Sequence, residues 1–210
     1  MTAPTAAPGL QAWKAQTRME LLLTLRRGES VLLTFLIPVL LLAFFSQVDV
    51  LPTGTDKPID FLLPGILSLA IMSTAMVSVA IATGFERQMG VLKRLGSTPL
   101  TRRQLLAAKT AAVVVVEILQ VIVLVTEGFI LGFRFSAPSL GLALLGAVLG
   151  TMAFAGLGMA LAGTLPALTT LAAANGLYLL LLLTGGMIIP LDELPDGVRA
   201  VSELLPAAAL

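Results

Sequence analysis

Long apolar stretches separated by short polar segments dominate the chain, and the first two of them carry no charge. The 19 residues between Glu29 and Asp49 are rich in Leu, Ile, Val and Phe. The 25 residues between Asp60 and Glu86 are also uncharged. A helix of about 20 apolar residues crosses the hydrocarbon core of a bilayer. We therefore predict membrane spans at 30–48 and 61–85.

The third apolar stretch contains two carboxylates, Glu117 and Glu127. An ionisable group inside a membrane is costly unless it faces protein or water. We therefore predict a span at 102–133 that is in contact with protein or water on one side.

A longer stretch of 57 residues between Arg134 and Asp192 has no charge and exceeds the length of one crossing. The turn-forming segment 163–166 divides it, which predicts spans at 139–162 and 167–189. The predicted fold class is an all-α integral membrane protein with five visible transmembrane helices.

Composition narrows the possible chemistry. Hydrophobic residues make up 57% of the chain and charged residues only 12%, against about 25% charged in soluble domains. The absence of cysteine and histidine excludes disulfides, Cys/His metal sites and His-based catalysis. A net charge of +1 argues against a nucleic-acid partner. We expect no metal, cofactor or enzymatic activity in this chain.

Basic residues concentrate in the N-terminal segment and in the 85–109 loop, which hold ten of the 13 Lys and Arg residues. Short loops rich in basic residues stay on the cytoplasmic side. This predicts a cytoplasmic N-terminus and loop, with 49–60, 134–138 and 190–210 outside. The ten residues are Lys14, Arg18, Arg26, Arg27, Arg87, Lys93, Arg94, Arg102, Arg103 and Lys109.

Residues 10–28 are predicted to form a helix in the membrane interface, because four apolar residues fall within one arc at 100° per residue. Trp13 would lie at headgroup depth, with Lys14 and Arg18 as anchors beside it. The alternative is a plain basic flank of the first span. The four apolar residues are Leu10, Trp13, Leu21 and Leu25.

Residues 86–100 have the pattern of a helix, a break and a new helix. Gly96 is a typical helix end and Pro99 prevents continuation. Thr101 with Gln104 forms a capping box that starts the next span. The predicted result is a short, rigid, basic element. The alternative is a segment whose basic residues only hold the loop on the cytoplasmic side. Its apolar positions are Met89, Leu92 and Leu95.

The loop contains three successive motifs: Glu86-Arg87, Gly90-x-Leu92-x-Arg94-Leu95 and Thr98-Pro99-Leu100. A second group near the C-terminus comprises Gly185-Gly186-Met187-Ile188-Ile189-Pro190, Leu194-Pro195 and Leu205-Pro206. In order and spacing these motifs resemble the type-2 ATP-binding-cassette (ABC) exporter permeases of bacteria, which export drugs, antibiotics and polysaccharides.

The resemblance implies roles for several segments. Residues 10–28 would be the elbow helix, and 190–210 a re-entrant extracytoplasmic segment. The family usually has a sixth helix, which we expect to follow Leu210 in a longer chain. The coupling element at 86–100 would dock on a separate ATPase subunit through Glu86, Arg87, Gly90, Leu92, Lys93, Arg94, Leu95, Thr98, Pro99 and Leu100.

The resemblance also implies partners: two copies of a cytoplasmic ABC ATPase, a second permease copy or close paralogue, and the bilayer of the bacterial cytoplasmic membrane. The chain lacks the Gly-x-x-x-x-Gly-Lys-[Ser/Thr] loop that binds nucleotide phosphates. ATP and Mg²⁺ would therefore be bound by the partner subunit.

The polar residues of the third span form one stripe, because Gln120, Glu127 and Arg134 repeat every seven residues and Glu117 lies close to Gln120 in angle. One interpretation is the lining of a translocation path or gate, to which Gly185, Gly186 and Pro190 would also contribute. The other is a structural contact within the bundle or across a dimer, including a Glu127–Arg134 pair.

Glycines four residues apart predict close helix contacts within the bundle or at a subunit interface. They occur as Gly128-x-x-x-Gly132, and as Gly146-x-x-x-Gly150 with Gly156.

The preferred hypothesis is the membrane subunit of an ABC exporter that moves a hydrophobic or amphipathic substrate, such as a drug, antibiotic or lipid, out of the cytoplasm. A scaffold that recruits a cytoplasmic partner is one alternative. A proton-coupled transporter using Glu117 and Glu127 is another, and an intramembrane enzyme is the weakest.

Overall fold

The computed structural model describes residues 9–26, 28–48, 58–98, 100–134 and 137–185, within which all regular structure is helical. The predicted all-α fold class is confirmed. The elements are α1 (Gly9–Arg26), α2 (Gly28–Phe45), α3 (Pro58–Met72), η1 (Ser73–Ser78), α4 (Val79–Gln88), α5 (Val91–Leu95), α6 (Arg102–Ile130), α7 (Ala137–Thr164) and α8 (Ala167–Thr184).

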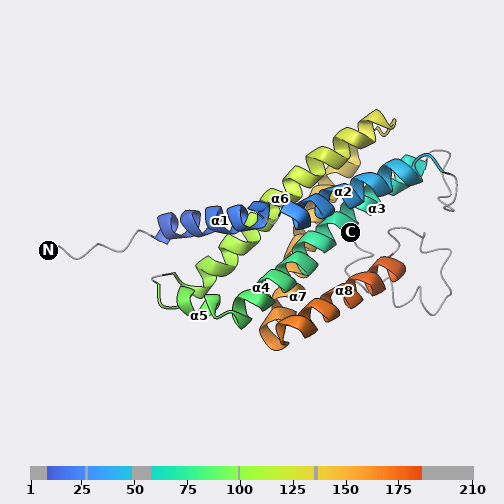
Figure 1. Ribbon diagram of the computed structural model, residues 1–210. Helices are drawn as coiled ribbons and strands as arrows, with labels where there is room; N and C mark the ends of the chain where they lie inside the picture. Colours follow the sequence, from blue (N-terminus) through green and yellow to red (C-terminus); the bar gives the residue numbers. More distant parts are fainter. Residues whose placement is uncertain (1–8, 27, 49–57, 99, 135–136, 186–210) are drawn as a thin grey trace.

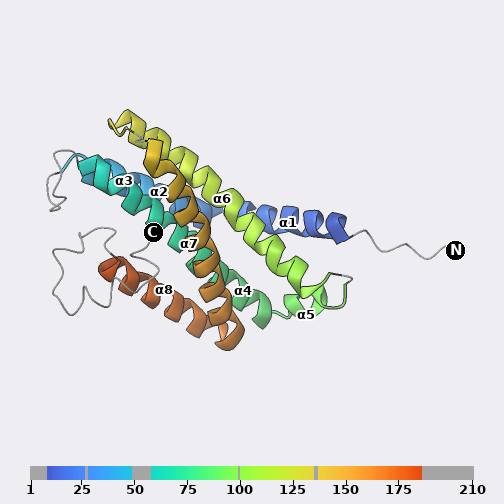
Figure 2. The same cartoon turned by 180° about the vertical axis from the view of Figure 1, so that it is seen from behind.

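The long helices run back and forth in one elongated bundle (Figures 1 and 2). The short helix α5, the end of α4 and the turn between α7 and α8 share one end, which we call the α5 end. The start of α3 and the end of α6 lie at the opposite end. Helix α1 packs along α6 and projects from the bundle near α5.

Four of the described helical segments are long and apolar enough to cross a membrane: Pro58–Gln88, Arg102–Ile130, Gly141–Thr164 and Ala167–Thr184. Helix α2 makes a fifth only together with α1, which is bent by 67° from Val31–Phe45. Four of the five predicted spans are thus helices of membrane-spanning length, and the first, 30–48, qualifies only as part of the bent pair with α1.

Most helix ends differ from the prediction by two or three residues: α2 is Gly28–Phe45 against 30–48, α6 ends at Ile130 against 133, and α7 is Ala137–Thr164 against 139–162. The second span begins at Pro58 and ends at Gln88, whereas the sequence predicts 61–85, because Asp60 is tolerated in the first turn of α3. The fifth helix ends at Thr184, with the Gly185 N–H bonded to the Leu181 carbonyl at 2.7 Å. The remainder of predicted span 167–189 lies outside the described residues.

The second span contains a π-helical segment, η1, which the sequence did not predict. It packs against α7, where Gly158 lies close to its backbone. A Cβ atom on Gly158 would lie 2.6 Å from the Met76 carbonyl oxygen. The π segment and a glycine on the neighbouring helix therefore fit each other.

Two apolar clusters hold the bundle together. One surrounds the fully buried Met76 and Phe154 and joins η1 to α6, α7 and α8. The other surrounds Leu42 and Leu62 and joins α2 to α3 and α6. The cores leave α2 and α8 on separate sides of the second span, since α2 packs on α3 and α6 while α8 packs on α4, η1 and α7.

The glycine prediction is confirmed at Gly128 and wrong at Gly132, Gly146 and Gly156 as regards contacts within the chain. A Cβ atom on Gly128 would lie 2.7 Å from Leu63 Cδ2, so this glycine does allow α6 to approach α3. Gly146 and Gly156 face open space, since a Cβ atom on either would have no neighbouring atom within 4 Å. Their proposed part in a subunit interface stays a prediction.

Candidate functional site

The α5 end carries the basic element predicted from the loop pattern. Helix α4 ends at Gln88, and Gly90 adopts a left-handed conformation, with φ of 72°, that starts α5. Helix α5 ends at Leu95, immediately before Gly96 as predicted. The capping box of Thr101 and Gln104 is confirmed in both directions, with the Thr101 N–H donating to Gln104 Oε1 at 2.9 Å.

The side chains of this element divide by exposure. Lys93, Arg94 and Thr98 are exposed, whereas Leu92 and Leu95 are half-buried. Gly90 and Leu100 are also half-buried, and Pro99 lies outside the described residues. The two exposed charges, Lys93 and Arg94, therefore lie on a short helix bounded by Gly90 and Gly96.

Arg87 fastens the α5 end to the turn between α7 and α8. Its Nη1 donates to the carbonyl oxygens of Ala162 at 2.8 Å and Gly163 at 2.5 Å. A third carbonyl, that of Leu165, lies at 3.5 Å. The guanidinium therefore satisfies carbonyls that the end of α7 leaves unpaired, where a positive charge is favourable.

Glu86 points into the bundle instead of out of it. Its Oε2 lies 2.6 Å from Lys109 Nζ on α6, and Glu20 Oε2 on α1 lies 3.0 Å from the same nitrogen. Gln16 donates to the other oxygen of Glu20 at 2.8 Å. The sequence had placed Glu86 in the docking surface, but its side chain is only 10% exposed. We call Glu20, Glu86 and Lys109 the ion triad.

Two residues of the predicted polar stripe make contacts between helices. Glu117 Oε2 accepts from Thr151 Oγ1 on α7 at 2.7 Å. Gln120 Oε1 accepts from Thr74 Oγ1 on η1 at 2.9 Å, and its Nε2 donates to the Thr34 carbonyl at 3.2 Å. Both Glu117 and Gln120 are buried, as expected for a helix side that faces protein.

The other end of the stripe is different. Glu127 is half-buried and Arg134 is exposed. Among the described residues, all ion pairs recorded belong to Lys109, so Glu127 and Arg134 form none. Gly185 is buried at the end of α8. Gly186, Pro190 and the predicted re-entrant segment 190–210 lie outside the described residues.

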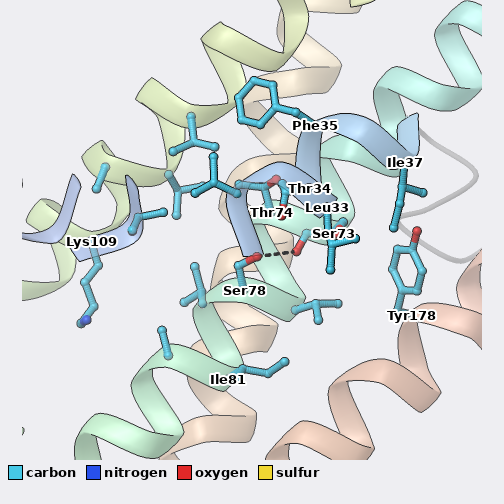
Figure 3. A pocket seen from close by; sticks show the side chains of 18 of the residues that line it. Leu33, Thr34, Phe35, Ile37, Ser73, Thr74, Ser78, Ile81, Lys109 and Tyr178 are labelled. Atoms are coloured by element: carbon cyan, nitrogen blue, oxygen red, sulfur yellow. Dashed lines mark hydrogen bonds between the residues drawn. The ribbon is translucent and has the colours of Figure 1, made fainter. Parts of the chain in front are cut away.

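A cavity of about 450 Å³ lies between α2 and α8. Figure 3 shows its floor, formed by the second span from Ser73 to Ile81, and Tyr178 of α8 opposite Ile37 of α2. Lys109 lies at one end of it. The volume is within the range of small-molecule sites, about 300–1,000 Å³.

The cavity wall is mostly apolar with a few polar groups. Ser73, Ser78 and Thr83 contribute hydroxyls from the second span. The Thr83 hydroxyl oxygen is buried and has no hydrogen-bond partner in the described structure. Glu20 and Lys109 supply the only charged side chains among the described lining residues. This combination suits an amphipathic molecule better than a strongly hydrated one.

The cavity does not coincide with the predicted path residues. Glu117 and Glu127 do not line it; α6 contributes Lys109 and the apolar residues that follow it. From the sequence, Lys109 counted only as one basic loop residue and Glu20 had no role. The signal that could have found them is that Glu20 is the single acid among residues 1–28 and Lys109 begins an apolar stretch.

The comparisons with known proteins agree with this architecture. Residues 11–210 match the family model described as ABC-2 type transporter. The chain is 25% identical over 198 residues to "Putative transport permease YvfS" of Bacillus subtilis (strain 168), covering 91% of this chain and 79% of that protein. No solved structure matches the chain.

The family match covers nearly the whole chain, and family membership implies an ABC ATPase as a partner in general. The apolar helices are those of a multi-pass membrane protein. The chain therefore belongs to the ABC-2 type transporter family and is a transport permease.

Proposed function

We propose that the chain is the membrane subunit of an ABC exporter, driven by ATP hydrolysis on a separate subunit, and that its cargo is hydrophobic or amphipathic. The observation that carries the proposal is the capped basic element at the α5 end. It continues directly into the second span on one side and, through the capping box, into α6 on the other. A partner that pushes on α5 would thereby move two spans.

The contacts around α5 support transmission of such a push. Arg87 holds the α7–α8 turn through backbone carbonyls, so the movement would reach α8 as well. Rigid-body displacement of packed helices is a common form of conformational change in proteins. A flexible loop in the same place would transmit less, because it deforms before the helices move.

The cavity supports the cargo part of the proposal. Its floor is the second span, whose end carries α5, and its opposite wall is α8, which follows the end of α7 that Arg87 binds. Movement of the α5 end would thus change the spacing of the cavity walls. We propose that cargo occupies this cavity on its way outward, as a drug, antibiotic or lipid.

The proposed assembly contains two permease copies, identical or closely related, and two ATPase subunits that bind ATP and Mg²⁺. The proposed orientation places the N-terminus and the α5 end in the cytoplasm of a bacterial cell. The distribution of basic residues supports this orientation. The position of Glu117 and Glu127 away from the cavity wall gives no support to a proton-carrier role.

The proposal is tested by reversing the chemistry of the exposed element. The double variant Arg94→Glu with Leu95→Asp should lose co-purification with the ATPase subunit and the ATP hydrolysis that depends on the complex. Arg103→Glu, an exposed charge reversal on α6 outside the element, is the matched control and should retain both. Intact assembly and hydrolysis in the double variant would refute the proposed docking role.

A further inference from the structure

The ion triad connects three helices, α1, α4 and α6, through side chains that are far apart in the sequence. Lys109 is on α6, Glu86 near the end of α4, and Glu20 on α1, 89 residues before Lys109 in the sequence. The three side chains are 7%, 10% and 11% exposed. A second tie runs in the same direction, since Gln104 Nε2 on α6 donates to the Gly9 carbonyl on α1 at 3.1 Å.

Stability alone does not require charges at this place. Removing charged groups from water is expensive, and apolar side chains of similar volume often replace a buried ion group with no loss of stability. Charged hydrogen bonds differ from apolar contacts in being directional and short. The charged hydrogen bonds of the triad therefore favour one relative position of the three helices. They are lost when the helices move apart, whereas apolar side chains can slide past one another and stay in contact.

Two of the three triad residues also lie in the wall of the cavity. Glu20 and Lys109 both line it, next to Thr24 of α1 and Ala112 of α6. Glu86 lies four residues before Gly90, the residue that starts α5. One cluster of three side chains therefore connects the element proposed for docking, the helix α1 and the cavity.

We propose that Lys109 is a positioning residue that makes α1, α4 and α6 respond together when α5 is pushed, and so couples the docking element to the cavity. Helix α1 is then a moving part of the coupling machinery and more than a membrane anchor. This inference rests on the proposed function, because it concerns how movement spreads from α5.

The test measures the response of the cavity to ATP without any cargo. Ser78 lies in the cavity wall and is exposed, and the chain has no cysteine, so Ser78→Cys gives a single reactive thiol. The permease carrying this change is reconstituted with its ATPase subunit. The rate of modification by a small maleimide is then compared without nucleotide and with ATP, Mg²⁺ and vanadate.

We call the permease with Ser78→Cys alone the reporter protein. The rate at which its thiol is modified should change when ATP, Mg²⁺ and vanadate are added. Addition of Glu20→Gln, Glu86→Gln and Lys109→Met should abolish that change while ATPase binding persists. Lys109→Arg, which keeps the charge, should retain it, and Arg103→Gln is the matched control for loss of an exposed charge on α6. An unchanged response in the neutralised variant would overturn the inference.

A gentler variant keeps the test valid if the neutralised protein fails to assemble. Glu20→Gln alone leaves Lys109 paired with Glu86, and so removes charge only from the contact with α1. It should weaken the response of the cavity thiol, and a response equal to that of the reporter protein would overturn the role of α1. Absence of any response in the reporter protein itself would instead refute the proposed function.

Discussion

The residue that changes the description of this molecule most is Lys109, because its ammonium group is buried between two carboxylates from other segments. Removing one partner of a buried ion group is more harmful than removing the whole group, since a charge is left without compensation. The burial of the triad therefore predicts an effect on stability that can be tested separately from its proposed role in coupling.

Lys109→Met should destabilise the purified protein by about 3–5 kcal/mol, because two buried carboxylates lose the positive charge that both contact. The variant that also carries Glu20→Gln and Glu86→Gln should recover most of this loss. The measurement is thermal unfolding in detergent for both variants. If Lys109→Met alone is as stable as the triple variant, the two buried carboxylates do not need the charge of Lys109 for stability.

Gly158 is the second residue at which a small change should have a large effect. Gly158→Ala places a Cβ atom 2.6 Å from the Met76 carbonyl oxygen, and backbone cannot give way as a side chain does. We expect a loss of about 1–3 kcal/mol, as for other overpacked contacts. Gly156→Ala on the same helix, with nothing within 4 Å, is the matched control in the same unfolding assay and should be neutral.

At the scale of elements, α5 depends on the backbone of Gly90. The value of φ, 72°, is left-handed, and nothing lies within 4 Å of a Cβ atom there, so any effect of a side chain comes from backbone strain. Gly90→Ala should cost about 1 kcal/mol. If docking needs α5 in place, affinity for the ATPase subunit should fall by somewhat less than tenfold.

Gly90→Asn should retain more affinity than Gly90→Ala, because asparagine tolerates the left-handed region better than other residues with a Cβ atom. Both are measured by titration of the ATPase subunit onto the permease in nanodiscs. Equal affinity of Gly90→Ala and the unchanged protein would mean that the conformation of α5 does not matter for docking.

The α7–α8 turn is the other element whose position depends on one side chain. Arg87→Met removes the donors that bind the carbonyls of Ala162 and Gly163. Hydrogen exchange in segment 163–170 should become faster, with Arg87→Lys intermediate because a single ammonium is a poorer match for several carbonyls. Unchanged exchange in Arg87→Met would show that the turn is held by packing alone.

Sequence reasoning succeeded for these elements where the signal is local. Charges mark the ends of spans, the break between α7 and α8 at residues 165–166 lies within the predicted turn 163–166, and Thr101 with Gln104 forms the predicted capping box. The π segment η1 was missed because a helical periodicity does not reveal a single wider turn, and its close approach to Gly158 belongs to the tertiary structure.

The candidate site was less accessible to sequence reasoning. The stripe through Glu117 and Gln120 was rightly expected to face protein or water, but its partners Thr151 and Thr74 belong to other helices. The triad was missed because Glu20 and Lys109 meet only after α1 packs along α6. Contacts between distant segments require the tertiary structure.

At the scale of the whole molecule, the α5 end is the proposed input and the cavity between α2 and α8 the proposed output. The central claim is that the α5 end faces the cytoplasm, where an ATPase subunit docks on it. Ser97 is exposed two residues after the end of α5, and the chain has no cysteine that would interfere. Ser97→Cys therefore reports directly on the side of the membrane that this end occupies.

The most direct measurement is modification of Ser97→Cys by a membrane-impermeant maleimide. We expect no modification in intact cells, rapid modification after permeabilisation, and protection when the ATPase subunit is co-expressed. Rapid modification of the thiol in intact cells would place the α5 end outside and contradict the central claim.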